Sequence, residues 1–151
     1  MIINYRPRLD ISMSPCYWPI EQLPGLDPQQ QKQLRSCGIL NTRQLLQKTH
    51  NAQAKVALAS RLQIHPQYLH KWVALADLAR LPSVGCQYCG LLLHAGIANV
   101  AQLAQMPISR LHRQILRLQV ATLQSRDGSP PVELVGRWIQ EARLVSTDNP
   151  R

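Results

Sequence analysis

A repeat with a spacing of 58 residues is the feature that most restricts the fold of this chain. Residues 23–46 align with residues 81–104 with nine identities in 24 positions. The match resumes near the end of each copy, where Trp72 aligns with Trp138 at a spacing of 66 residues. Because a repeat of this length means that one structural unit occurs twice, we predict two similar units that pack on each other.

Each copy carries the signals of short helices. Leu-Pro precedes a four-residue turn, the next helix ends at Gly-Ile, and Asn, a favoured N-cap, begins a third helix. Helix-forming residues are frequent and no strand alternation is present, so we expect an all-α protein. The expected parts are an N-terminal tail at 1–19, a first unit at 20–80, a second unit at 81–145 and a C-terminal tail at 146–151. The helices expected to close the units span approximately 51–63, 66–80, 108–123 and 131–145.

Two short helices joined by a tight turn, followed by Gly-Ile and a third helix, resemble the helix-hairpin-helix superfamily. The resemblance covers about residues 20–145, and the endings WVALADL and WIQEARL are similar to a tandem helix-hairpin-helix family known as a domain of unknown function. This resemblance implies two tandem helix-hairpin-helix units. It also implies that a hairpin turn, typically Gly-apolar-Gly, presents backbone N–H groups to a nucleic-acid phosphate. Because glycine has no side chain, the phosphate can approach the backbone closely.

The two hairpin turns depart from that pattern in different ways. In the first turn, Gly25–Asp27, the Asp27 side chain is expected to cap the following helix and to occupy or repel the place of a phosphate. In the second turn, a small Ser83 can donate a hydrogen bond and Gly85 stands at the helix start. The expected phosphate-binding residues there are Arg80, Ser83, Val84 and Gly85. The alternative is that both turns only reverse the chain between helices.

The segment at 108–120 predicts an amphipathic helix with an arginine face. At about 100° per residue, three arginines fall on one stripe and three apolar residues on another. The arginines are Arg110, Arg113 and Arg117, and the apolar residues are Leu111, Ile115 and Leu118. Three interpretations stay open: a face that is only solvated, a face that binds phosphates or acidic groups, and a face that lies on a membrane surface.

The charge of the chain narrows its expected partners to anions. Formal net charge is +9, from 17 Lys plus Arg against 8 acids. Asp77 is the only acid between Pro28 and Arg126, a span that holds twelve Lys or Arg. Nucleic acid is the first partner that this excess predicts and an acidic protein the second. No targeting segment and no long apolar run is visible, so we expect a soluble, cytoplasmic protein without a membrane span.

The CxxC pair of Cys86 and Cys89 suggests a metal or redox site, but packing is the favoured interpretation. A zinc site needs about four ligands, and the chain has no second CxxC. The first copy has Pro28 and Gln31 at the corresponding positions, so the unit does not need the thiols. We therefore expect four reduced cysteines with a packing role, leaving a metal site shared with a partner or redox chemistry as the alternatives.

The sequence contains no recognisable set of catalytic residues, so we predict that the protein is not an enzyme. Helix-hairpin-helix glycosylases with lyase activity place a nucleophilic lysine just beyond the hairpin, whereas the last lysine here, Lys71, precedes the second hairpin. No acid pair, triad or Walker-type loop is present, and we expect no cofactor, metal or small-molecule substrate. Trp72 and Trp138 are expected to anchor the core. Trp18 is expected either to hold the N-terminal tail or to contact a partner.

These observations lead to two hypotheses about function. The first is that a non-enzymatic helix-hairpin-helix module binds the nucleic-acid backbone, of DNA or RNA, without reading its sequence. The second is that the same basic face belongs to an adaptor that docks on an acidic surface of a larger protein assembly.

Overall fold

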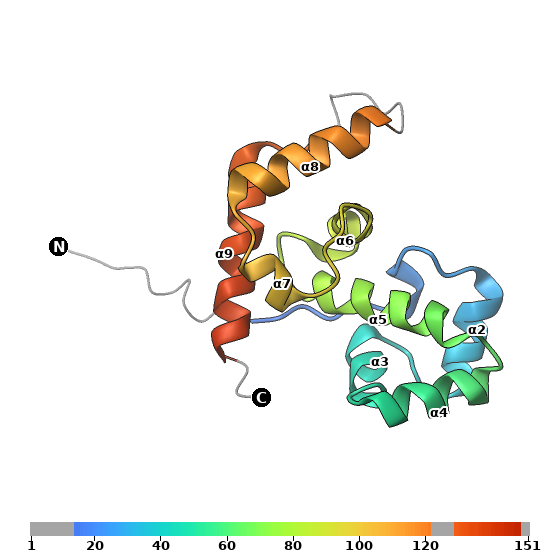
Figure 1. Ribbon diagram of the computed structural model, residues 1–151. Helices are drawn as coiled ribbons and strands as arrows, with labels where there is room; N and C mark the ends of the chain where they lie inside the picture. Colours follow the sequence, from blue (N-terminus) through green and yellow to red (C-terminus); the bar gives the residue numbers. More distant parts are fainter. Residues whose placement is uncertain (1–13, 122–128, 149–151) are drawn as a thin grey trace.

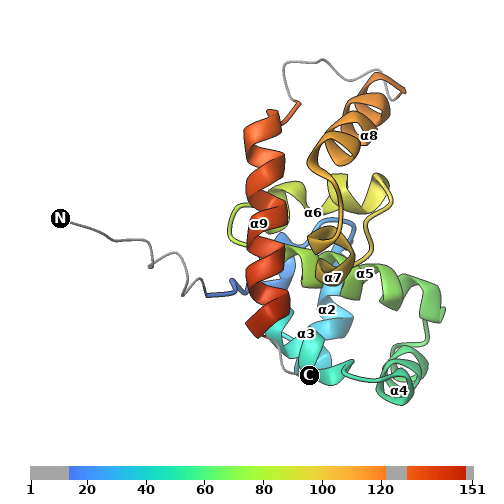
Figure 2. The ribbon, with the colours of Figure 1, turned by 60° about the vertical axis from the view of Figure 1, so that its left-hand side comes forward.

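The computed structural model describes residues 14–121 and 129–148, and within them all regular elements are helical (Figures 1 and 2). The prediction of an all-α fold is therefore confirmed. The elements are η2 (Ile20–Gln22), α2 (Pro28–Ser36), α3 (Thr42–Lys48), α4 (Ala52–Leu62), α5 (Pro66–Ala79), α6 (Gly85–His94), α7 (Val100–Ala104), α8 (Ile108–Ala121) and α9 (Val132–Asp148). α9 continues to Asp148, past the predicted end at residue 145, because no glycine or proline stops it before Pro150.

The helices begin where side chains cap them. Asp27 caps α2 by accepting a hydrogen bond from the Gln30 backbone N–H at 2.7 Å, and the Gln30 side chain accepts from the Asp27 N–H at 3.0 Å. Asn41 and Asn99 begin α3 and α7 in the same manner, each accepting from the N–H three residues later at 2.9 and 2.8 Å. These three predicted N-caps are confirmed, and they satisfy donors that a helix start otherwise leaves unpaired.

Two glycines end α2 and α6. Gly38 and Gly96 have φ values of 81° and 99°, which lie in the left-handed region that glycine adopts without strain. The chain then reverses, so that the N–H of Ile39 reaches back to Leu34 and the N–H of Ile97 reaches back to Leu92, both at 3.0 Å. Both isoleucines are buried, and each fixes the direction of the next segment by packing in the core.

One hydrophobic core runs through both predicted units. α5 crosses the middle of the molecule and packs on α3, α4 and α6, whereas α9 packs on α7 and α8 (Figure 1). Trp72 on α5 and Trp138 on α9 are 2% and 0% exposed, so the prediction that both anchor the core is confirmed. In both views α8 lies at one end of the molecule and α4 at the other (Figures 1 and 2).

Residues 14–19 of the expected N-terminal tail are bonded to the body of the protein. The Cys16 N–H donates to the Arg80 carbonyl at 2.7 Å. Trp18 exchanges hydrogen bonds with Thr42, and its indole Nε1–H donates to the Ala79 carbonyl at 2.8 Å. This segment therefore links the start of α3 to the end of α5, and Trp18 holds it in place.

Candidate functional site

The second hairpin turn has its polar groups bonded to α9. Ser83 donates from its backbone N–H to Glu141 Oε1 at 3.0 Å and from its hydroxyl to Glu141 Oε2 at 2.6 Å. The Ser83 carbonyl accepts a hydrogen bond from the indole of Trp138 at 3.0 Å. Glu141 is only 8% exposed. The carboxylate of α9 therefore occupies the position in front of Ser83 where the sequence predicts a phosphate.

The remaining backbone donors of this turn also have internal partners. The N–H groups of Val84 and Gly85 both reach the Leu81 carbonyl, at 3.0 and 2.9 Å. Gly85 has a φ of 53°, and a Cβ built on it would lie 3.2 Å from Cζ2 of Trp18. Glycine is thus required here for two reasons, a left-handed backbone and a tryptophan ring packed against it.

The first turn contains its own carboxylate, which belongs to a residue of the turn itself. Gly25 has a φ of 86°, and Asp27 forms the capping box with Gln30. A Cβ built on Gly25 would lie 3.9 Å from Leu75 of α5, an ordinary contact distance. The Asp27 carboxylate therefore lies at the start of α2, where the helix dipole favours a negative charge.

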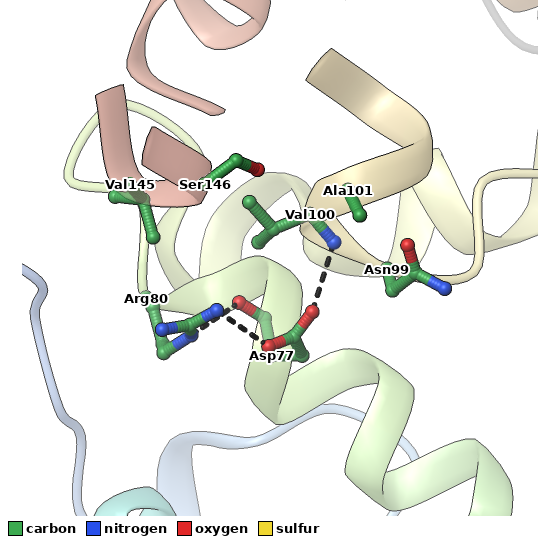
Figure 3. Close-up of a pocket in the computed structure, with 7 residues that line it drawn as sticks. All are labelled: Asp77, Arg80, Asn99, Val100, Ala101, Val145 and Ser146. Carbon is green, nitrogen blue, oxygen red and sulfur yellow. Dashed lines mark hydrogen bonds and ion pairs between the residues drawn. The ribbon is translucent and has the colours of Figure 1, made fainter. Parts of the chain in front are cut away.

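Arg80 is engaged in an ion pair beside a pocket between α5, α7 and α9 (Figure 3). Its guanidinium lies 2.7 Å from Asp77 Oδ1, and the other oxygen of that carboxylate accepts the Val100 N–H at 2.8 Å. The pocket is lined by Asp77, Arg80, Asn99, Val100, Ala101, Val145 and Ser146. Asp77 thus joins α5 to α7, and the Arg80 side chain points toward Asp77 (Figure 3).

The arginine face of α8 is open. Arg110, Arg113 and Arg117 are exposed, whereas Leu111 and Ile115 on the opposite stripe are fully buried. Within residues 14–121 and 129–148, the guanidinium groups of these three arginines have no hydrogen-bond or ion-pair partner. Among the predicted site residues, these three arginines keep their guanidinium groups available to a partner. No hydrogen bond or ion pair within the described residues connects them to the Ser83 turn.

The two cysteines of the CxxC pair lie in an apolar environment. Cys89 is fully buried and Cys86 is partly buried. Burial raises the pKa of Cys86 from 9.0 to about 11. Burial and the neighbouring Cys86 raise the pKa of Cys89 to about 12. Reactive cysteines have lowered pKa values, so these thiols have the opposite character. In the described part of the chain, no three His, Cys, Asp or Glu side chains gather as metal ligands.

Sequence reasoning missed the role of Glu141. The sequence does contain a signal, because Glu141 lies on the apolar stripe of α9 with Val135, Trp138 and Val145, all of them buried. An acid on a buried stripe needs a partner. Which partner it meets depends on how α9 packs against the second turn, and spacing along the chain does not contain that information.

The fold and these contacts define an all-α protein in which carboxylates of the chain occupy both hairpin turns and one arginine-rich helix face stays open. Residues 24–145 match the family model described as Domain of unknown function (DUF4332), and the chain belongs to that family. Neither a curated protein nor a solved structure matches the chain. Among the helices of the described residues, none has the length and apolar character needed to cross a membrane.

Proposed function

We propose that the protein binds the phosphate backbone of nucleic acid through the arginine face of α8, without reading the base sequence and without catalysis. The observation that carries this proposal is the exposed stripe of Arg110, Arg113 and Arg117, which has no partner in the described residues. The stripe extends over about 10 Å of helix, since each residue adds about 1.5 Å. Arginine pairs with phosphate through a planar fork of donors, which suits repeated backbone contacts.

The charge distribution supports the same proposal. Three of the acids on the described helices and turns are committed to ion pairs within the chain, at Glu21 with Arg35, Asp77 with Arg80 and Glu141 with Arg137. The net charge of +9 therefore leaves an excess of unpaired basic groups. Such an excess attracts a polyanion over a distance of about 8 Å at physiological salt. It also supports a non-enzymatic function, since these acids already have structural roles.

In this proposal the second hairpin turn is not a primary contact. Ser83, Val84 and Gly85 have their donors bonded within the chain, and Arg80 is paired with Asp77. A phosphate would have to displace Glu141 before it could bind there.

We also propose that the chain consists of two helix-hairpin-helix units at 20–80 and 81–145. Three features of the structure support it: α2 to α5 follow one another in the same order as α6 to α9, Gly25 and Gly85 both have positive φ in the turns, and Trp72 and Trp138 are buried on the helices that close the units.

A cytoplasmic location is part of the proposal, and the four free cysteines support it, because disulfides are rare in that compartment.

A second candidate function is a protein adaptor that docks the same arginine face on an acidic protein surface. The occupied turn at Ser83 favours it, because that turn was expected to bind phosphate and its Ser83 donors are bonded to Glu141 instead. Reversing the charge at Arg113 and Arg117 separates the two functions. An adaptor would lose a protein partner in a pull-down while its weak affinity for nucleic acid hardly changes.

Charge reversal with a matched control tests the first function. The variant Arg110→Glu, Arg113→Glu, Arg117→Glu is compared with Lys32→Glu, Lys48→Glu, Lys71→Glu, whose lysines are exposed on α2, α3 and α5. Both variants change the net charge equally. The arginine variant should bind a short duplex at least tenfold more weakly. The slope of its log affinity against log salt concentration should become shallower by about 2.7, since each of three lost phosphate contacts contributes about 0.9 to that slope. Equal losses in the two variants would contradict a specific role for α8.

A further inference from the structure

Glu141 is a buried carboxylate held by three donors. The Ser83 N–H and hydroxyl bind its two oxygens at 3.0 and 2.6 Å, and the Arg137 guanidinium lies 3.5 Å from Oε2. A buried carboxylate without partners would be strongly unfavourable, so this donor set compensates for the loss of water. Glu141 is 8% exposed, whereas Arg137 is largely exposed and reaches the carboxylate from the solvent side.

Further contacts hold the turn that carries the Ser83 donors. The Trp138 indole holds the Ser83 carbonyl at 3.0 Å, and Gly85 directly after the turn packs under the Trp18 ring. A backbone N–H, an adjacent hydroxyl and a guanidinium are the groups that bind carboxylates and phosphates elsewhere in proteins. The environment of Ser83 would therefore suit a small oxyanion from any source.

We infer that the turn at Ser83 is a small-oxyanion site that the chain fills with its own Glu141 carboxylate. The free protein is consequently closed to external phosphate at this turn. Removing the Glu141 carboxylate leaves a space lined by Ser83 and Arg137 that a carboxylate or phosphate ion of solution fills. This inference does not depend on the arginine face of α8, so loss of nucleic-acid binding in an α8 variant leaves it unaffected.

Chemical rescue of Glu141→Ala tests the inference. The substitution removes the –CH2–COO− group, which has the shape of an acetate ion. The melting temperature is measured in chloride, acetate and inorganic phosphate at equal ionic strength. Glu141→Ala should melt below the natural protein in chloride and should regain about 2–4 °C in acetate or phosphate near saturation. Comparing the two anions shows whether the site prefers a planar or a tetrahedral oxyanion.

Three variants serve as controls. Glu133→Ala removes an exposed acid from the same helix and reports the general effect of each salt, as does the natural protein. Glu141→Gln keeps an oxygen acceptor in the space and should show no rescue. Adding Ser83→Ala to Glu141→Ala removes the hydroxyl donor and should reduce the rescue.

Three results would overturn the inference, the third of which applies if Glu141→Ala is unfolded in chloride. One is a rise in melting temperature of Glu141→Ala in acetate and phosphate that is no larger than that of the natural protein. A second is a saturable, phosphate-specific stabilisation of the natural protein that Ser83→Ala abolishes, because the site would then be open in the presence of Glu141. If Glu141→Ala is unfolded in chloride, recovery of the helical circular dichroism signal in either anion is the readout, and failure of both anions to restore it contradicts the inference.

Discussion

Two turns of the chain, one starting at Gly25 and the other at Ser83, each lead into a helix. Each turn has a carboxylate bonded to a backbone N–H group at the start of that helix or just before it. In the first turn the carboxylate is Asp27, which caps the helix that it precedes. In the second turn it is Glu141, which comes from a helix 58 residues further along the chain. The first arrangement forms from neighbouring residues and the second only when α9 packs in place. The two turns therefore differ in how much of the fold each depends on.

The largest expected effect is at the second turn. Glu141→Ala leaves the N–H and hydroxyl of Ser83 without partners in a partly buried place, and should lower the free energy of unfolding by about 3 kcal/mol. Urea denaturation followed by circular dichroism measures this loss. Glu133→Ala on the same helix should cost about 0.5 kcal/mol. A similar small loss at both positions would mean that the Glu141 contact contributes little to the packing of α9.

A second prediction compares the glycines of the two turns. Gly85→Ala should lower the free energy of unfolding by about 2 kcal/mol and Gly25→Ala by about 1 kcal/mol, since both adopt left-handed backbone that costs a residue with a Cβ about 1–2 kcal/mol. The difference arises because the new Cβ meets Trp18 at 3.2 Å in the first case and Leu75 at 3.9 Å in the second. Adding Trp18→Leu should reduce the difference, and an unchanged difference would remove the tryptophan from the explanation.

A third prediction concerns the local cap. Asp27→Ala should lower the free energy of unfolding by about 1 kcal/mol, the usual cost of losing an N-cap side chain. Asp27→Asn should restore most of this stability because its amide oxygen still accepts the Gln30 N–H. Thermal unfolding of the two variants checks the order. A loss at Asp27 larger than at Glu141 would reverse the comparison between the turns.

The smallest effect is a dependence of stability on alkaline pH that arises from the two thiols beside the second turn. Burial raises the pKa of Cys86 to about 11 and that of Cys89 to about 12, from the ordinary thiol value of 9.0. The folded thiols therefore hold their protons more tightly than the unfolded ones. Their contribution to stability is complete below pH 9 and falls as the pH rises above it. Urea denaturation at pH 8 and pH 10 should show a decrease that is smaller in Cys86→Ala, Cys89→Ala. An equal decrease in that variant would assign the effect to other groups.

Local signals in the sequence predicted most of the helices. The caps at Asp27, Asn41 and Asn99 and the glycine at Gly38 act within a few residues, so composition and spacing contain them. The closing helix expected at 66–80 is observed at Pro66–Ala79 for the same reason. Periodicity likewise placed the arginines of α8 on an exposed stripe opposite Leu111 and Ile115.

Contacts between distant segments were beyond the reach of these signals. Ser83 meets Glu141, and Trp18 packs against Gly85, only after α9 and the N-terminal segment have packed against the second turn. The sequence marks each residue as unusual, an acid on an apolar stripe and a tryptophan without a counterpart in the repeat, but it does not name its partner. The expected phosphate turn was consequently assigned donors that the folded chain already uses.

Fluorescence anisotropy of the natural protein with short DNA and RNA, single- and double-stranded and of unrelated sequences, tests the proposed function most directly. The measurement is made from low salt to physiological salt. The account predicts binding that persists at micromolar affinity, weakens linearly with the logarithm of salt concentration and hardly depends on base sequence. Binding that disappears at physiological salt would contradict the proposed function, and an acidic protein partner would then be sought for the arginine face of α8.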